Sequence, residues 1–143
     1  TRRSSDLFQS KNVESMQVKE QMETSFKSLL PMKVGGLEIK CVAIEYRDNV
    51  SFGESIDSGK IDVIYITPLR SVKLADILAV TAKLKVLTQT GVPDYVQQGV
   101  SVGIGIKDNK PEILVNQRSS VAEGAELSSQ LLRIATLFDR IVK

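Results

Sequence analysis

Side chains that could support catalysis are scarce in this 143-residue chain. It contains no histidine, which removes the commonest general base, the usual catalytic triads and most zinc sites. Its single cysteine, Cys41, cannot form an intramolecular disulfide, and its place in the apolar run 39–44 predicts a buried core thiol. No Gly-x-Ser-x-Gly nucleophile elbow is present. We therefore predict that the protein has no catalytic residues and is not an enzyme.

The acidic and hydroxyl side chains are explained better by solvent exposure and helix capping than by a reactive site. Four carboxylates lie close together in sequence, but no pair has metal-ligand spacing: Asp48, Glu54, Asp57 and Asp62. Four serines fall where helices are expected to begin, and hydroxyls there bond free backbone N–H groups: Ser119, Ser120, Ser128 and Ser129. We predict neither a metal site nor a cofactor.

Glycines at positions 99, 103 and 105 are as closely spaced as those of a phosphate-binding loop, but their context does not fit one. They alternate inside a strand pattern, and no helix opens directly after them. We expect them to be small residues on one strand face beneath a packed helix.

Polar residues follow two buried strands, and these are the best candidates for a binding site. Thr67 and Pro68 follow one strand, and Thr88, Gln89 and Thr90 end the next. In open parallel sheets, ligands bind beyond the carboxyl ends of the strands. These five residues are therefore candidate ligand or partner contacts, although turns are also polar for no functional reason.

Composition is that of an ordinary globular domain. Hydrophobic residues make up 42% of the chain, and 19 basic against 17 acidic residues give a net charge of +2. This balance, with aromatic residues at 5%, gives no footprint for nucleic acid. No run approaches the roughly 20 apolar residues of a membrane span. The length suits one domain over residues 1–143.

Hydrophobic patterning predicts alternating helices and strands. Residues 1–10 are polar and look like a loop, residues 11–30 have helical spacing, and residues 36–46 alternate as a strand. Ser51 and Glu54 have capping-box spacing, which predicts a short helix from Ser51 to about residue 58. The segment 60–68 is apolar on both faces, as in a central parallel strand.

The second half continues with a helix from Ser71 to about Lys83 and a strand over 84–91. A helical turn over 93–99 precedes an antiparallel hairpin, 100–106 and 112–116. Ser120 and Glu123 suggest another capping box, and a last helix is expected over 128–142. The predicted fold is α/β: a three-layer sandwich with a mostly parallel sheet of βαβ units, a C-terminal antiparallel hairpin and a terminal helix.

The segment from 100 to 138 resembles the C-terminal signature of the YfiR family. A glycine-containing strand, a charged turn and a strand ending in Asn lead to a short Ala/Gly helix and a Ser-Ser-x-Leu-Leu run. The family-signature residues matched here have mainly structural roles: Asn116, Gly124, Ser128, Ser129, Leu131 and Leu132. The resemblance extends from about Gly36 onward. The family's first strand is not recognisable, so the chain is expected to lack that strand or an N-terminal segment, leaving a sheet edge exposed.

The resemblance implies a periplasmic, or otherwise extracytoplasmic, regulator of cyclic-di-GMP signalling. Such proteins repress a membrane-bound diguanylate cyclase by binding its extracytoplasmic part, and a homodimer is an arrangement that the family often adopts. The alternative is a small-molecule-binding module similar to one lobe of a periplasmic substrate-binding protein, with its ligand at Thr67–Pro68 and Thr88–Thr90.

Overall fold

The computed structural model describes residues 2–29, 33–34 and 37–139. The chain divides into two compact units, Thr1–Val72 and Lys73–Lys143, each with its own strands and helices. Both are of the α/β class, which confirms the predicted fold class. One domain over residues 1–143 stays a prediction.

The first unit is a parallel sheet with one short antiparallel strand at its edge. Its elements are β1 (Arg2–Phe8), α1 (Val13–Leu29), β2 (Lys33–Val34), β3 (Leu37–Glu45), α2 (Asn49–Gly59) and β4 (Val63–Ile66). The strand order is β2-β3-β1-β4, with β1 parallel to both β3 and β4 and with β2 antiparallel to β3.

Strand β1 corrects two of our predictions. Residues 1–10 were expected to form a loop and the first strand to be absent, yet Arg2–Phe8 is a strand between β3 and β4. The segment has few apolar residues, so hydrophobic alternation could not mark it. Its two neighbours provide the backbone hydrogen bonds, and its buried positions are Ser5 and Leu7. In the described part of the chain β1 therefore fills the place between β3 and β4 that was expected to be empty.

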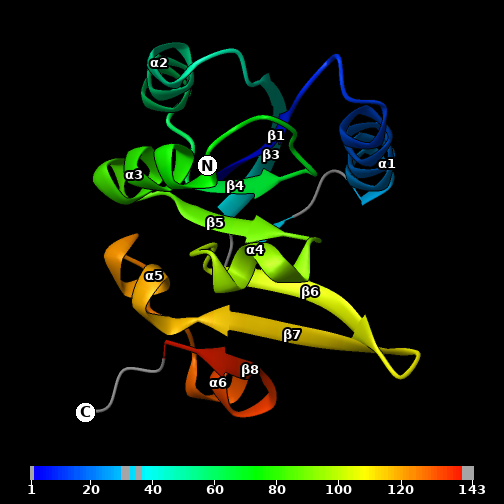
Figure 1. The fold of residues 1–143 in the computed structure, drawn as a ribbon, viewed down its shortest axis with the longest axis vertical. Helices are drawn as coiled ribbons and strands as arrows, with labels where there is room; N and C mark the ends of the chain where they lie inside the picture. Colours follow the sequence, from blue (N-terminus) through cyan, green and yellow to red (C-terminus); the bar gives the residue numbers. More distant parts are fainter. Residues whose placement is uncertain (1, 30–32, 35–36, 140–143) are drawn as a thin grey trace. The chain divides into compact units, whose positions relative to one another are not determined.

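Helices α1 and α2 lie on opposite sides of the β1, β3 and β4 strands (Figure 1). Right-handed crossovers require this, because β1 to β3 and β3 to β4 move in opposite directions across the sheet. The core between the layers consists of fully or almost fully buried side chains: Leu7, Phe52, Ile56, Ile61, Ile64 and Ile66. The side chain of Cys41 lies outside the described residues.

Helix α2 begins two residues before the predicted Ser51. Asp48 is its N-cap and accepts the Ser51 backbone N–H at 2.8 Å. Ser51 lies inside the first turn, and its hydroxyl also donates to Asp48. The predicted capping box was wrong. In that box Glu54 would accept the Ser51 backbone N–H, but the Asp48 carboxylate, three residues before Ser51, accepts it instead.

The second unit contains the predicted hairpin. Its elements are α3 (Leu74–Leu84), β5 (Leu87–Thr90), α4 (Pro93–Gln97), β6 (Val102–Lys107), β7 (Lys110–Asn116), α5 (Gln117–Ala122), α6 (Ser129–Ile134) and β8 (Thr136–Phe138). Within this unit the strand order is β5-β6-β7-β8, and only the β6–β7 pair is antiparallel. Its core includes Ile77, Val86, Val96, Val100, Leu114 and Val115.

Gly103 and Gly105 lie beneath α4, as expected. A Cβ atom on Gly103 would overlap the Val96 side chain, and one on Gly105 would lie 3.0 Å from Pro93 Cγ. The absence of a side chain therefore lets α4 approach the strand closely. Gly99 does have a positive φ of 120°, at the end of that helix.

Three helix boundaries in this unit differ from the prediction. Helix α3 begins at Leu74 rather than Ser71, which has a positive φ of 56°. Helix α5 is capped by Asn116, so Ser120 lies inside it and Glu123 beyond its end. The terminal helix stops at Ile134, because Ala135 is extended and the next three residues pair with β7. Residues 140–142 of the expected helix lie outside the described residues.

Candidate functional site

The candidate contacts Thr67 and Pro68 follow β4 in the first unit, but their polar atoms bond within the protein. Thr67 is completely buried, and its hydroxyl donates to the Leu7 carbonyl oxygen at 2.7 Å and contacts the Ser15 hydroxyl. The Pro68 carbonyl oxygen accepts from Asn12 Nδ2 at 3.2 Å. These contacts join β4 to β1 and to the start of α1.

Thr88, Gln89 and Thr90 lie on β5 in the second unit. Thr88 and Thr90 are buried, and Gln89 is half-buried. The Thr90 hydroxyl accepts the Val92 N–H at 3.1 Å, which shapes the turn into α4. The Thr88 hydroxyl bonds Glu123. The hydroxyls at these strand ends thus support the fold, while Gln89 and Pro68 remain partly accessible.

Glu123 is a buried acidic residue that the sequence reasoning missed. It is only 4% exposed. Its carboxyl group meets the hydroxyls of Thr81 (3.1 Å) and Thr88 (2.9 Å), the Thr88 backbone N–H (2.9 Å) and the Ser101 hydroxyl. A signal for this cluster was present: hydroxyl residues occupy inward-facing positions of otherwise apolar segments, where a polar partner is required.

Burial raises the pKa of Glu123, because desolvation disfavours the charged form, and the hydrogen bonds from Ser101, Thr88 and Thr81 only partly offset this. The four residues come from α3, β5, the segment before β6 and the end of α5. The carboxyl group therefore connects four parts of the second unit. We call these four side chains the Glu123 cluster: Thr81, Thr88, Ser101 and Glu123.

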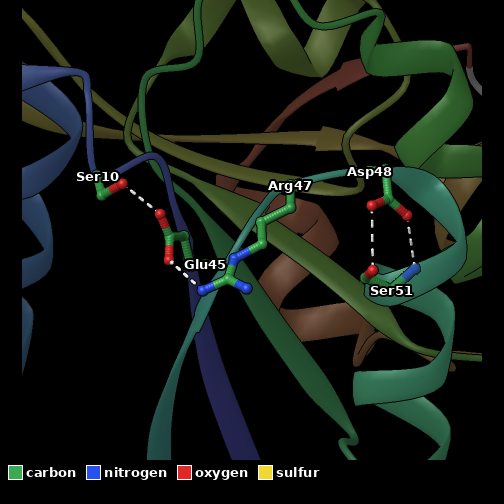
Figure 2. A network of polar contacts seen from close by, with 5 residues as sticks. All are labelled: Ser10, Glu45, Arg47, Asp48 and Ser51. Carbon is green, nitrogen blue, oxygen red and sulfur yellow. Dashed lines mark hydrogen bonds and ion pairs between the residues drawn. The ribbon is translucent and has the colours of Figure 1, made fainter.

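A second polar cluster lies at the carboxyl end of β3 in the first unit (Figure 2). Glu45 accepts a hydrogen bond from the Ser10 hydroxyl and one from Arg47 Nη2 at 3.3 Å. Both donors hold the pKa of Glu45 below its usual value, with Ser10 contributing most. Asp48 points instead towards α2, where hydrogen bonds from Ser51 lower its pKa.

A shallow pocket of about 290 Å³ opens beside this cluster. Its lining is mixed: Ala43, Ile44, Glu45, Arg47, Ser51 and Ser55. The Arg47 side chain is 75% exposed, so its remaining guanidinium donors face solvent. The pocket lies at the carboxyl end of β3, one strand away from the switch point between β1 and β4, where ligands usually bind in open α/β sheets.

Exposed apolar side chains mark the β6–β7 hairpin in the second unit. Ile104 is 60% and Ile106 is 80% exposed, on the strand face opposite Gly103 and Gly105. They pair in register with Ile113 and Pro111 of β7, which lie on the same face. We call these four residues the hairpin face.

An apolar groove of about 640 Å³ lies between α5 and α6 of the same unit. Its lining includes Val121, Ala125, Leu127 and Leu132. Among the described residues no cluster of three or more metal-type ligands occurs. Within that part of the chain, no helix is long and apolar enough to cross a membrane.

The signature residues occupy structural positions. Asn116 caps α5 and Ser128 caps α6, each accepting the N–H three residues later at 3.1 Å. Gly124 has a positive φ of 79°, and its backbone lies against the Lys85 side chain. Ser129, Leu131 and Leu132 belong to α6, where the two leucines are half-buried.

Residues 8–136 match the model of the YfiR/HmsC-like family. The chain belongs to the YfiR/HmsC-like family. The match extends across both units, from the end of β1 to the start of β8. Comparison with curated proteins gave no match.

The fold of this YfiR/HmsC-like chain is similar to that of larger solved proteins. One is the ligand-free, open form of a substrate binding protein with adhesive properties from Clostridium difficile, at 16% identity and a TM-score of 0.67. Another is an ABC domain in complex with L-Trp from Streptococcus pneumonia, at 12% and 0.63. A third is a conserved domain protein from Vibrio cholerae, at 13% and 0.68.

The alignments cover 95–96% of this chain but only 54% of each of the three solved chains. The chain therefore spans about half the length of these structures. At such low identity the likeness shows a shared fold and nothing about the ligand.

Proposed function

We propose that this YfiR/HmsC-like protein is a periplasmic, or otherwise extracytoplasmic, regulator that acts by binding another protein. The partner is the extracytoplasmic part of a membrane-bound diguanylate cyclase, which the protein represses. Family membership over residues 8–136 is the observation that carries the proposal.

The hairpin face is the surface we propose for this contact. Ile104 and Ile106 are among the most exposed large apolar side chains described, and each borders an apolar neighbour on β7. When a partner covers apolar residues grouped on one strand face, their removal from water favours binding. Burial of one isoleucine is worth about 1.5–3 kcal/mol. Its loss should weaken binding about tenfold or more.

The test compares two charge substitutions at sites that are both more than two thirds exposed. Ile106→Glu places a charge on the hairpin face, while Val50→Glu does the same on α2, where Val50 is 71% exposed. Binding to purified extracytoplasmic domains of membrane-bound diguanylate cyclases from the same organism is measured by calorimetry. We expect Ile106→Glu to weaken binding and Val50→Glu to leave it unchanged. Equal affinities for both variants would refute the hairpin face as the contact.

A homodimer is part of this proposal. Sedimentation of the purified chain over a range of concentrations should give a species of twice the monomer mass. A monomer at every concentration would remove the dimer from the proposal while leaving the partner contact open to the calorimetric test.

The alternative proposal is a small-molecule-binding module. It is supported by the likeness to a substrate binding protein and to an ABC domain in complex with L-Trp, and by the pocket at the end of β3. The Glu45 carboxylate and the Arg47 guanidinium there suit an ammonium and a carboxylate, as in an amino acid. A panel of amino acids should raise the melting temperature of the wild type and not of Arg47→Ala. A flat response across the panel would exclude this alternative.

A further inference from the structure

We propose that Glu123 is a pH-sensitive clasp in the second unit. Uptake of a proton by its carboxyl group holds the end of α5 against α3, β5 and the segment before β6, and loss of the proton loosens that junction. The inference concerns how the fold responds to acidity and does not depend on which partner or ligand the protein binds.

The clasp is built from one carboxyl group and the donors around it. Oε2 lies 2.9 Å from the Thr88 backbone N–H and also contacts the Ser101 hydroxyl. Oε1 lies 2.9 Å from the Thr88 hydroxyl and 3.1 Å from the Thr81 hydroxyl. The Thr88 hydroxyl additionally accepts the Ser101 backbone N–H at 3.0 Å. The carboxyl contacts thus tie the end of α5 to three other parts of the second unit, and the bond between Thr88 and Ser101 ties two of those parts to each other.

The hydrogen bonds around Glu123 can form whether its carboxyl group is protonated or ionised. The Thr81 hydroxyl has one proton and two acceptors at 3.1 Å, Glu123 Oε1 and the Leu78 carbonyl oxygen. When the carboxyl group is ionised, Thr81 donates to it. When the group is protonated, Oε1 donates to Thr81 Oγ1, and the Thr81 proton turns to Leu78. One hydroxyl rotation therefore accommodates the proton without loss of a hydrogen bond.

The charge of the ionised form has no cation beside it among the described contacts. The elements around the carboxyl group are α3, β5, the segment before β6 and α5. Of these, β5 and the segment before β6 carry no charged residue. The charged residues on the helices and directly after them are exposed: Asp76, Lys83, Lys85, Arg118 and Glu126. Lys85 directs its ammonium group to the Ala122 carbonyl oxygen at 2.7 Å. Only neutral dipoles therefore compensate the buried charge, and desolvation raises the pKa of Glu123.

The sign of the response follows from that raised pKa. In an open, solvated state the carboxyl group titrates near its ordinary value of 4.5. Below that pH the carboxyl group is protonated in both states, and the closed state has its greatest stability relative to the open state. As the pH rises through the higher pKa of the closed state, the closed state loses stability relative to the open one. Helix α5 and the segment after it line the apolar groove, so the groove loosens as the pH rises.

Hydrogen exchange of the full chain, corrected for the intrinsic pH dependence of exchange, tests the clasp from below pH 4.5 to neutral pH. In the wild type the opening constant of peptides spanning 81–88 and 117–125 should rise by up to about tenfold per pH unit before it levels off. Glu123→Gln mimics the protonated form and should remove this rise. Glu126→Gln changes an exposed carboxyl group three residues away and should keep it.

Two results would overturn the clasp. One comes from hydrogen exchange: an opening constant that rises with pH equally in Glu123→Gln and wild type, or that falls as the pH rises in wild type. The other comes from wild-type protein alone, so it stands even if the variant does not fold: a carbon NMR titration of the Glu123 carboxyl group with its midpoint at or below 4.5. A midpoint above that value supports the proposal.

Discussion

Asn116 offers a sharp test of whether the family signature has a structural role. The residue is 1% exposed, and its side chain makes two short hydrogen bonds besides a long one, at 3.5 Å, from Nδ2 to Asp139 Oδ2. Oδ1 accepts the Ser119 N–H and so caps α5, while Nδ2 donates to the Val96 carbonyl oxygen at 3.0 Å. Asn116→Ala removes both. The cap is worth about 1 kcal/mol and the buried bond about 1 kcal/mol, because the Val96 oxygen keeps its second donor at Gly99.

The expected loss for Asn116→Ala is therefore about 2 kcal/mol in the free energy of unfolding. Ser128→Ala is the matched control, since it removes the cap of another six-residue helix with no second bond. It should cost about 1 kcal/mol or less. Urea denaturation at fixed pH measures both, with an unchanged slope and a shifted midpoint.

Asn116→Asp separates the two bonds. The introduced carboxylate still caps α5, but it faces the Val96 carbonyl oxygen and lies near Asp139 Oδ2, which is 3.5 Å from Asn116 Nδ2. A buried, unpaired charge costs about 3 kcal/mol or more. Protonation gives the introduced group a donor again, so stability should recover as the pH falls through its raised pKa. A variant Asn116→Asp as stable as wild type at neutral pH would refute this account of the signature.

Further substitutions at four positions test the packing, hydrogen bonds and helix cap that surround the candidate sites. Gly103→Ala should destabilise the fold by about 1–3 kcal/mol in urea, because its Cβ overlaps Val96, and Gly105→Ala should cost less. Thr67→Val should cost about 1–2 kcal/mol by calorimetry, since it removes a buried hydroxyl with two partners. Asp48→Ala should lower helix content and thermal stability at neutral pH, and Asp48→Asn should cost less, because its amide oxygen still caps the helix without the charge. The loss caused by Asp48→Ala should shrink as the pH falls through the lowered pKa of Asp48, because protonation weakens the wild-type cap too.

The sequence alone was enough to predict the elements in which burial produces a clear apolar periodicity within a single segment. The β4 strand, helix α1 and the β6–β7 hairpin are recognisable because their periodicity reflects burial within one segment. The two glycines beneath α4 were also recognisable, since only a close helix explains small residues on one strand face.

Elements that depend on distant partners were not recognisable. The polar segment Arg2–Phe8 forms a strand only because β3 and β4 lie on either side of it. Residues 136–138 have helical spacing but join the free edge of β7. Tertiary hydrogen bonding overrides local propensity in both cases.

The Glu123 cluster was hidden for a related reason. Its four members are separated by up to 42 residues, and although a buried hydroxyl indicates that some polar partner is needed, it does not say which one. Their joint burial is a property of the folded second unit, so spacing could not reveal it. The hydroxyls of Thr67, Thr88 and Thr90 bond within the protein, and their role as ligand or partner contacts stays a prediction.

Cyclase activity in membrane vesicles tests the central claim most directly. Purified protein is added to the extracytoplasmic face of vesicles that contain a membrane-bound diguanylate cyclase of the same organism, and cyclic-di-GMP synthesis is measured on the other face. We predict that the wild type and Val50→Glu lower synthesis in a saturable way and that Ile106→Glu does not. Synthesis that wild-type protein leaves unchanged with every such cyclase would contradict the proposed regulatory function.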